Sequence, residues 1–269
     1  MQKKETWHDL RKRARWDRLL GAGAVLFLLL ILIISSINSC AKKSKSETEP
    51  VILETQLSET QPTTEEVIDN SQAVFLSPST QENNLYACDN TISEETAMWM
   101  IGRKVKDMLE ADGYQVYICG EDDAVPWKVK QGNALKCGAY VAIHSNSSGE
   151  LGTGEGTECY YNSNVTGSKA LAENIYNHVA EVTPTKDRGV KDETQRDLYE
   201  ILNNISPCCL VEVEFHDKTK TSSWILNHID DLAQAITDGT EAYLANAQYL
   251  PREDITEPEL HIDDTYVEY

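Results

Sequence analysis

The pattern of apolar and polar positions beyond residue 72 alternates between two periods. Short apolar runs, typical of buried strands, are followed by longer segments whose apolar residues recur at helical spacing. The predicted strands are 73–76, 114–119, 140–144, 157–161 and 209–215, and the predicted helices are 94–111, 127–136, 169–182 and one or two within 224–244. Strands that alternate with helices predict an α/β fold, a single domain with a twisted, mainly parallel sheet covered by helices on both faces.

The N-terminal part has a different pattern. Every residue from Leu19 to Ile37 is apolar or small, and we expect a transmembrane helix over 19–40. Basic residues are concentrated before this helix, so the positive-inside rule predicts a cytoplasmic basic segment 1–18. A second interpretation is a lipoprotein anchored at Cys40, because residues 37–40 loosely resemble a lipoprotein cleavage site.

Composition divides the rest of the chain. Residues 41–72 are rich in Ser, Thr and Glu and poor in aromatic residues, which predicts a flexible extracytoplasmic linker. The domain is expected over 73–246, followed by an acidic C-terminal tail at 247–269. The protein is therefore expected in the cell membrane as a single-pass protein, with its N-terminus in the cytoplasm and its domain outside.

The charge balance excludes one class of partner. The whole chain carries a formal net charge of −20, and the part beyond residue 45 contains 14 basic and 41 acidic residues. Such a surface repels phosphate, so a nucleic-acid partner is excluded. The seven cysteines are scattered without a Cys-x-x-Cys pair, which predicts neither a zinc ribbon nor a regular disulfide framework.

Three polar residues stand at informative places: Glu94 begins the first helix, His144 ends the strand 140–144, and Glu212 lies inside the strand 209–215. Glu94 would also suit a helix N-terminus for its favourable interaction with the dipole, and His144 would suit a hydrogen-bonded position at a sheet edge. Glu212 is harder to explain by packing. A carboxylate in so apolar a strand is costly unless it is paired, protonated or near a metal.

Strand periodicity adds two residues to this group. In an extended chain, Glu214 and His216 lie on the same side as Glu212. Two carboxylates and an imidazole on one side favour a site, and the alternative is an outward-facing polar side of an edge strand.

Several blocks of the domain, taken in order and spacing, resemble the zinc-dependent N-acetylmuramoyl-L-alanine amidases of type 3. The blocks are VFLSPSTQ at 74–81, Glu94 with Met98 and Ile101, AIHSN at 142–146, GTECYY at 156–161, RGV at 188–190 and LVEVEFH at 210–216. The Ser-Pro-Ser-x-Gln start resembles a subgroup found in Gram-positive bacteria and their phages. The resemblance covers nearly the whole domain.

The resemblance implies a peptidoglycan hydrolase that cleaves the amide bond between N-acetylmuramic acid and L-alanine, in cell-wall catabolism or remodelling. It implies zinc as the cofactor, with Glu94 and His144 as ligands and Glu212 as the general base that acts on the attacking water. The matching blocks also suggest Asn146 and Arg188 as substrate-binding residues. Glu214 and His216 are possible accessory residues.

The family's first zinc histidine has no counterpart in this chain. Where the family usually has Asp-Pro-Gly-His, residues 77–80 are Ser-Pro-Ser-Thr, and no other histidine lies between Val74 and His144. The remaining candidates for a third ligand are Gln81, Asn83, Asn84 and His216. An alternative function is a catalytically degenerate amidase-fold module that binds peptidoglycan or a partner protein.

Overall fold

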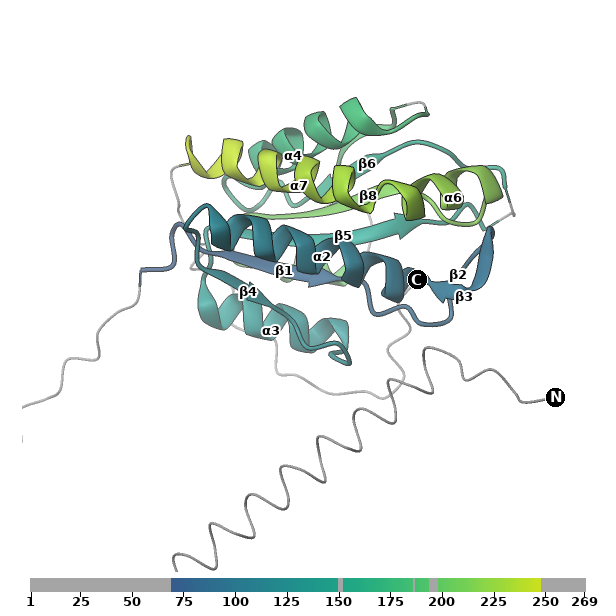
Figure 1. Ribbon diagram of the computed structural model, residues 1–269. Coiled ribbons are helices and arrows are strands. Elements are labelled where there is room, and N and C mark those ends of the chain that lie inside the picture. The colour runs from purple at the N-terminus through teal and green to yellow at the C-terminus, as the bar shows by residue number, and fades with distance from the viewer. Residues whose placement is uncertain (1–68, 150–151, 186, 194–197, 248–269) are drawn as a thin grey trace, which may run out of the picture. The chain divides into compact units, whose positions relative to one another are not determined.

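The computed structural model of the chain describes residues 69–149, 152–185, 187–193 and 198–247 (Figure 1). A central sheet of six strands has the order β4-β1-β5-β8-β6-β7. The strands are β1 (Val74–Pro78), β4 (Val116–Ile118), β5 (Ala139–Asn146), β6 (Glu158–Tyr161), β7 (Gly189–Asp192) and β8 (Cys208–Phe215). The first four in spatial order, β4, β1, β5 and β8, are parallel, whereas β6 runs antiparallel to β8 and parallel to β7. The predicted mainly parallel sheet is confirmed.

Helices cover both faces of this sheet. On one face pack α2 (Glu94–Ala111), α4 (Ser168–Val182) and α7 (Ile229–Leu244), and on the other lie α3 (Val125–Leu135) and the short α5 (Tyr199–Leu202). In Figure 1, α2 and α7 run side by side, and α3 lies beyond β4 at the lower edge. The first face buries the larger core, which includes Val141, Val211 and Ile236.

Two local features bring α2 to the carboxyl end of the parallel strands. A small antiparallel hairpin, β2 (Leu85–Tyr86) and β3 (Asp89–Ser93), follows β1 and leads directly into the helix. Ser93 is the N-cap, and its side chain accepts a hydrogen bond from the backbone N–H of Thr96 at 3.1 Å. Glu94 is therefore fixed as the first residue of the helix, beyond the end of the sheet.

Most predicted elements are present, with small shifts of their ends. The helix predicted over 94–111 has these bounds, and the segment 224–244 belongs to two helices, α6 (Thr219–Asn227) and α7. The hairpin, β7 and α5 were not predicted, because each is short and follows from tertiary pairing rather than from an apolar period.

The predictions for residues 1–18, 19–40 and nearly all of 41–72 lie outside the described residues, as does the tail after residue 247. Among the helices that the structure describes, none is both long and apolar enough to cross a membrane.

Candidate active site

Glu94 and His144 form the centre of the site at the carboxyl end of the sheet. The helix start at α2 supplies Glu94, β5 supplies His144, and both side chains are buried. His144 Nδ1 lies 3.1 Å from Glu94 Oε1. Burial opposes the charge on Glu94, but the hydrogen bond and the charge of His144 outweigh burial and lower the pKa of that carboxyl.

A second buried carboxylate, Glu200 of α5, lies on the other side of the His144 ring. Its Oε2 is 3.6 Å from His144 Nε2. Burial alone would lower the pKa of His144, but Glu200 and Glu94 together hold this pKa well above its ordinary value. His144 is therefore a cation between two anions in the metal-free chain.

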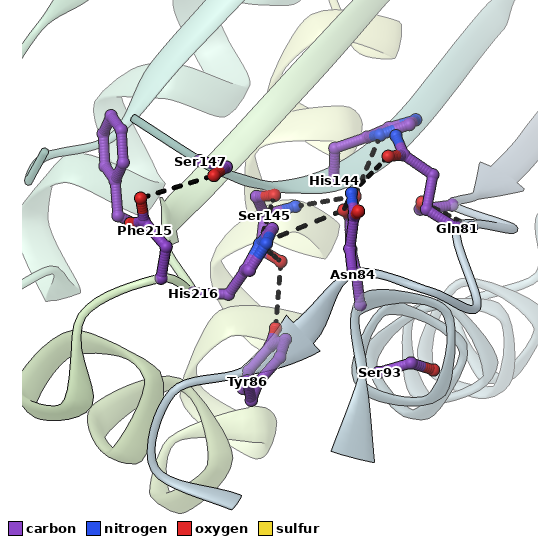
Figure 2. Close-up of polar contacts among 12 residues, drawn as sticks. Gln81, Asn84, Tyr86, Ser93, His144, Ser145, Ser147, Phe215 and His216 are labelled. Carbon is purple, nitrogen blue, oxygen red and sulfur yellow. Dashed lines mark hydrogen bonds and ion pairs between the residues drawn. The ribbon is translucent and has the colours of Figure 1, made fainter. Parts of the chain in front are cut away.

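The neutral amide of Asn84 holds the outer oxygen of Glu94. Asn84 Nδ2 donates to Glu94 Oε2 at 3.1 Å and also to Gln81 Oε1. Figure 2 shows the side-chain amides of Asn84 and Gln81 turned toward each other. Asn84 is thus hydrogen-bonded to the Glu94–His144 pair, whereas Gln81, among the hydrogen bonds of the described residues, is linked to the pair through Asn84.

His216 approaches the same pair from the end of β8. Its Nδ1 is 3.9 Å from Glu94 Oε2, but it is only 2.8 Å from the backbone oxygen of Ser145. The ring stacks on Tyr86 at 5.5 Å between centroids, and the Tyr86 hydroxyl donates to Ser145 Oγ at 3.0 Å (Figure 2). Because Nδ1 donates its proton to the Ser145 carbonyl, it has no lone pair for a metal.

Glu212 lies in β8. The strand register pairs it with His144 of β5 on one side and with Glu158 of β6 on the other. Its charge contributes to the raised pKa of His144, after burial and the two nearer carboxylates. Of the site residues that the sequence predicted, Glu94, His144 and Glu212 are therefore neighbours.

The two predicted substrate-binding residues converge on Glu158. Asn146 Nδ2 donates to Glu158 Oε1 at 2.6 Å and Arg188 Nε donates to Glu158 Oε2 at 2.8 Å. Lys191 also pairs with this carboxylate. Burial opposes its ionisation, but these donors outweigh burial and lower the pKa of Glu158. Glu158 is thus held as an anion beside Glu212.

Glu214 and His216 do not share one side of the strand with Glu212, which corrects the prediction from periodicity. The β5–β8 ladder shifts register between His144 and Asn146, as at a β-bulge, and this interrupts the alternation. Glu214 instead accepts the backbone N–H of Gly156 at 2.7 Å and the Thr185 hydroxyl. Its carboxylate secures the segments around 156 and 185.

The donor set fits zinc in part. A carboxylate oxygen and an imidazole nitrogen are both donors that zinc accepts, and Glu94 Oε1 and His144 Nδ1 lie 3.1 Å from each other. Within the described ranges, no three side chains of His, Cys, Asp or Glu gather closely enough to hold a metal together. Glu94 and His144 are suitable ligands, and a third strong ligand is not among the described residues.

The sequence of the chain matches a known protein family. The sequence profile of the N-acetylmuramoyl-L-alanine amidases matches residues 74–242, from β1 into α7. The chain belongs to this family. The resemblance inferred from the sequence blocks is confirmed, and with it the predicted enzyme class at the level of the family.

Two relatives of this amidase domain come from Bacillus subtilis strain 168. The N-acetylmuramoyl-L-alanine amidase LytC is 27% identical over 179 residues, which are 64% of this chain and 35% of LytC. The chain thus matches about a third of the length of LytC. The uncharacterized protein YqiI is 27% identical over 164 residues, which are 58% of this chain and 77% of YqiI.

Solved structures of amidases share the fold. An N-acetylmuramoyl-L-alanine amidase from Clostridium difficile 630 superposes with a TM-score of 0.60 at 24% identity, over 66% of this chain and 100% of that structure. The catalytic domain of CwlV, an amidase from Bacillus (Paenibacillus) polymyxa var. colistinus, has a TM-score of 0.58 at 25% identity, over 65% of this chain and 99% of that domain.

Sequence reasoning did not find Glu158 and Glu200. A signal was present for Glu200, because this carboxylate lies within the apolar run from Leu198 to Leu202, the same feature that drew attention to Glu212. Glu158 lies in a strand of mixed polarity, so only the pairing with β8 brings it to the site.

Proposed function

We propose that this domain hydrolyses the amide bond between N-acetylmuramic acid and L-alanine in peptidoglycan, in cell-wall catabolism or remodelling. Membership of the amidase family gives the reaction class. The observation that carries the proposal to this chain is the buried Glu94–His144 pair with Glu212 beside it in the register. A module that only binds has no physical need for a buried carboxylate–imidazole pair at the carboxyl end of its sheet.

Glu94 and His144 are the residues that would hold zinc in this proposal, through Oε1 and Nδ1. Asn84 is a candidate for the third donor, because its side-chain amide already contacts Glu94. When bound, the ion acidifies water and polarises the amide carbonyl. An amide oxygen is a weaker ligand than an imidazole. We therefore expect this chain to bind zinc more weakly than a family member that has the first histidine.

The protein's own side chains contribute base catalysis and positioning. Glu212, partly exposed on β8, accepts the proton of the attacking water and passes it to the leaving nitrogen. Arg188 and Lys191 offset the charge of Glu158, so that a second carboxylate is tolerated next to Glu212. Asn146 and Arg188 thus act on the site through Glu158.

A degenerate module that binds peptidoglycan without cutting it is the second candidate. The specific observation in its favour is that the described residues supply only two strong zinc ligands. The two candidates differ in one measurable property, because only the enzyme releases stem peptides from the wall.

The test compares the full chain with its Glu212→Gln variant on purified peptidoglycan, with added zinc and with a chelator. We expect zinc-dependent release of peptides, reduced by about 100- to 10,000-fold in the variant because it lacks the general base. Glu110→Gln is the matched control, since Glu110 is an exposed residue of α2 that pairs with Lys106. Sedimentation with the wall and no release would favour the binding module.

A further inference from the structure

Arg188 and Lys191 place two positive charges beside one buried carboxylate. Arg188 directly precedes β7, and Lys191 lies within it. Arg188 Nε is 2.8 Å from Glu158 Oε2, and the Lys191 ammonium pairs with the same oxygen. The other oxygen, Oε1, accepts the side-chain amide of Asn146 and the hydroxyl of Tyr160. One cation offsets the charge of one carboxylate, so the second is more than the burial of Glu158 requires.

The two cations lie on the same face of the sheet as Glu212. Residues that pair directly across two strands share a face, and the register pairs Glu158 with Glu212 and Tyr160 with Lys191. Glu158 and Tyr160 are two residues apart in β6, so their side chains also share a face. The Lys191 ammonium lies 5.4 Å from the centroid of the Tyr160 ring, as this arrangement requires.

Both cations keep donors that no protein group uses. The side chain of Arg188 is 37% exposed and that of Lys191 is 31% exposed, whereas Glu158 is only 2% exposed. A guanidinium has five N–H donors, and among the hydrogen bonds of the described residues Arg188 uses only Nε. Its guanidinium carbon lies 5.1 Å from the centroid of the Phe215 ring, at the end of β8 where the site is. The remaining donors are therefore available to a ligand in the site.

The spacing of the strands indicates which part of a bound peptide these donors reach. Strand β7 lies two strands from β8, which is about 10 Å between their backbones. An extended peptide covers roughly 3.5 Å per residue. The long side chains of Arg188 and Lys191 shorten the gap, so the second residue after a bond cut at Glu212 comes within their reach.

We propose that Arg188 and Lys191 form a carboxylate-binding subsite, which recognises an acidic second residue in the peptide released from the wall. The proposal rests on the amidase function proposed above. Hydrogen bonds from a guanidinium or an ammonium to a carboxylate are shorter and stronger than those between neutral groups. In a chain with a net charge of −20, this local excess of positive charge selects a carboxylate over a neutral carboxamide.

The experiment compares two synthetic muramoyl tripeptides that differ in one group. Both have an amidated C-terminus, and the second residue carries a free α-carboxylate in one and a carboxamide in the other. The full chain is tested with its Arg188→Gln and Lys191→Gln variants, in which the new amide can still donate to Glu158. Lys169→Gln is the matched control, because it removes the same charge from an exposed position on α4. Urea unfolding checks that each variant is folded.

We expect the wild type to cleave the carboxylate tripeptide with a kcat/KM about tenfold higher than the carboxamide tripeptide. In Arg188→Gln and in Lys191→Gln this ratio should fall to about threefold or less, since each loses one of the two charges. Lys169→Gln should keep the wild-type ratio. A role limited to holding Glu158 would instead lower kcat/KM equally for both tripeptides and leave the ratio unchanged.

Equal kcat/KM values for the two tripeptides in the wild type would overturn the proposal, as would a wild-type ratio in folded Arg188→Gln and Lys191→Gln. If the wild type cleaves neither tripeptide, titration calorimetry of both with the full chain decides. Tighter binding of the carboxylate tripeptide, reduced in Lys191→Gln, would then contradict the amidase function and leave the subsite supported. Equal binding of the two, or none, would overturn the subsite.

Discussion

The imidazole of His144 lies between two buried carboxylates, 3.1 Å from Glu94 and 3.6 Å from Glu200. Each of the three groups would be costly to bury alone, and together they offset one another. Burial opposes ionisation of Glu200, but His144 and Lys128 outweigh it and lower the pKa of this carboxyl to about 2. The proposed reaction centre is therefore also a source of pH-dependent stability.

The metal-free chain should lose stability at both ends of the pH range. The raised pKa of His144 gives stability that is complete below pH 6.5 and is lost as pH rises through the folded-state pKa. The lowered pKa of Glu200 gives stability that is complete above pH 4.5 and is lost as pH falls toward about 2. Both losses should appear as a lower free energy of unfolding outside the range between pH 4.5 and pH 6.5.

Urea unfolding in the presence of a chelator, repeated along a pH series, measures these two losses. In His144→Gln, the free energy of unfolding should no longer fall between pH 6.5 and about 8.5. The series stops there because unperturbed cysteine thiols begin to ionise near that pH. An equally steep loss in the variant and in the wild type would show that another group is responsible.

At the scale of elements, the sequence predicted the helices and strands whose apolar residues recur at a regular spacing. The helix at 94–111 and the strand predicted over 140–144, which is the central part of β5, were found because their apolar residues recur regularly. The position of His216 could not be predicted, since the register shift between β5 and β8 depends on pairing partners. Glu200 reaches the site from a helix of four residues, too short for any periodicity.

The contact between α4 and α7 gives a prediction at this scale. A Cβ added at Gly239 of α7 would lie 2.6 Å from the backbone Cα of Ile175 in α4, so the two helices would have to separate. We expect Gly239→Ala to lower the free energy of unfolding by about 1–3 kcal/mol. Urea unfolding measures this difference.

Gln234→Ala is the control for that substitution, because Gln234 is exposed on the same helix. Among the described residues, its side chain forms a hydrogen bond only with Asp238. The site is built from other elements, so peptide release per folded molecule should be unchanged in Gly239→Ala. Equal stability of the two variants would contradict the close approach of α4 and α7.

At the scale of the whole molecule, we propose that residues 19–40 anchor the domain outside the cell membrane. The support is the apolar run that follows seven basic residues before position 19. Anchoring would keep an acidic domain close to its substrate, although both carry negative charge.

Fractionation of cells that express the chain tests this anchor. The full chain and its Cys40→Ser variant should both be recovered in the membrane fraction, and protease added outside the cytoplasm should digest the domain. Loss of membrane association in Cys40→Ser would favour the lipoprotein alternative, and a soluble full chain would contradict both interpretations.

The most direct test of the amidase function is the identity of the bond that is cut. Purified peptidoglycan is incubated with the full chain and zinc, and the products are analysed by mass spectrometry. The account predicts stem peptides with a free L-alanine amino group, together with glycan strands whose muramic acid carries a free lactyl carboxylate. Products cut at a glycosidic bond or within the stem peptide, or unchanged peptidoglycan, would contradict it.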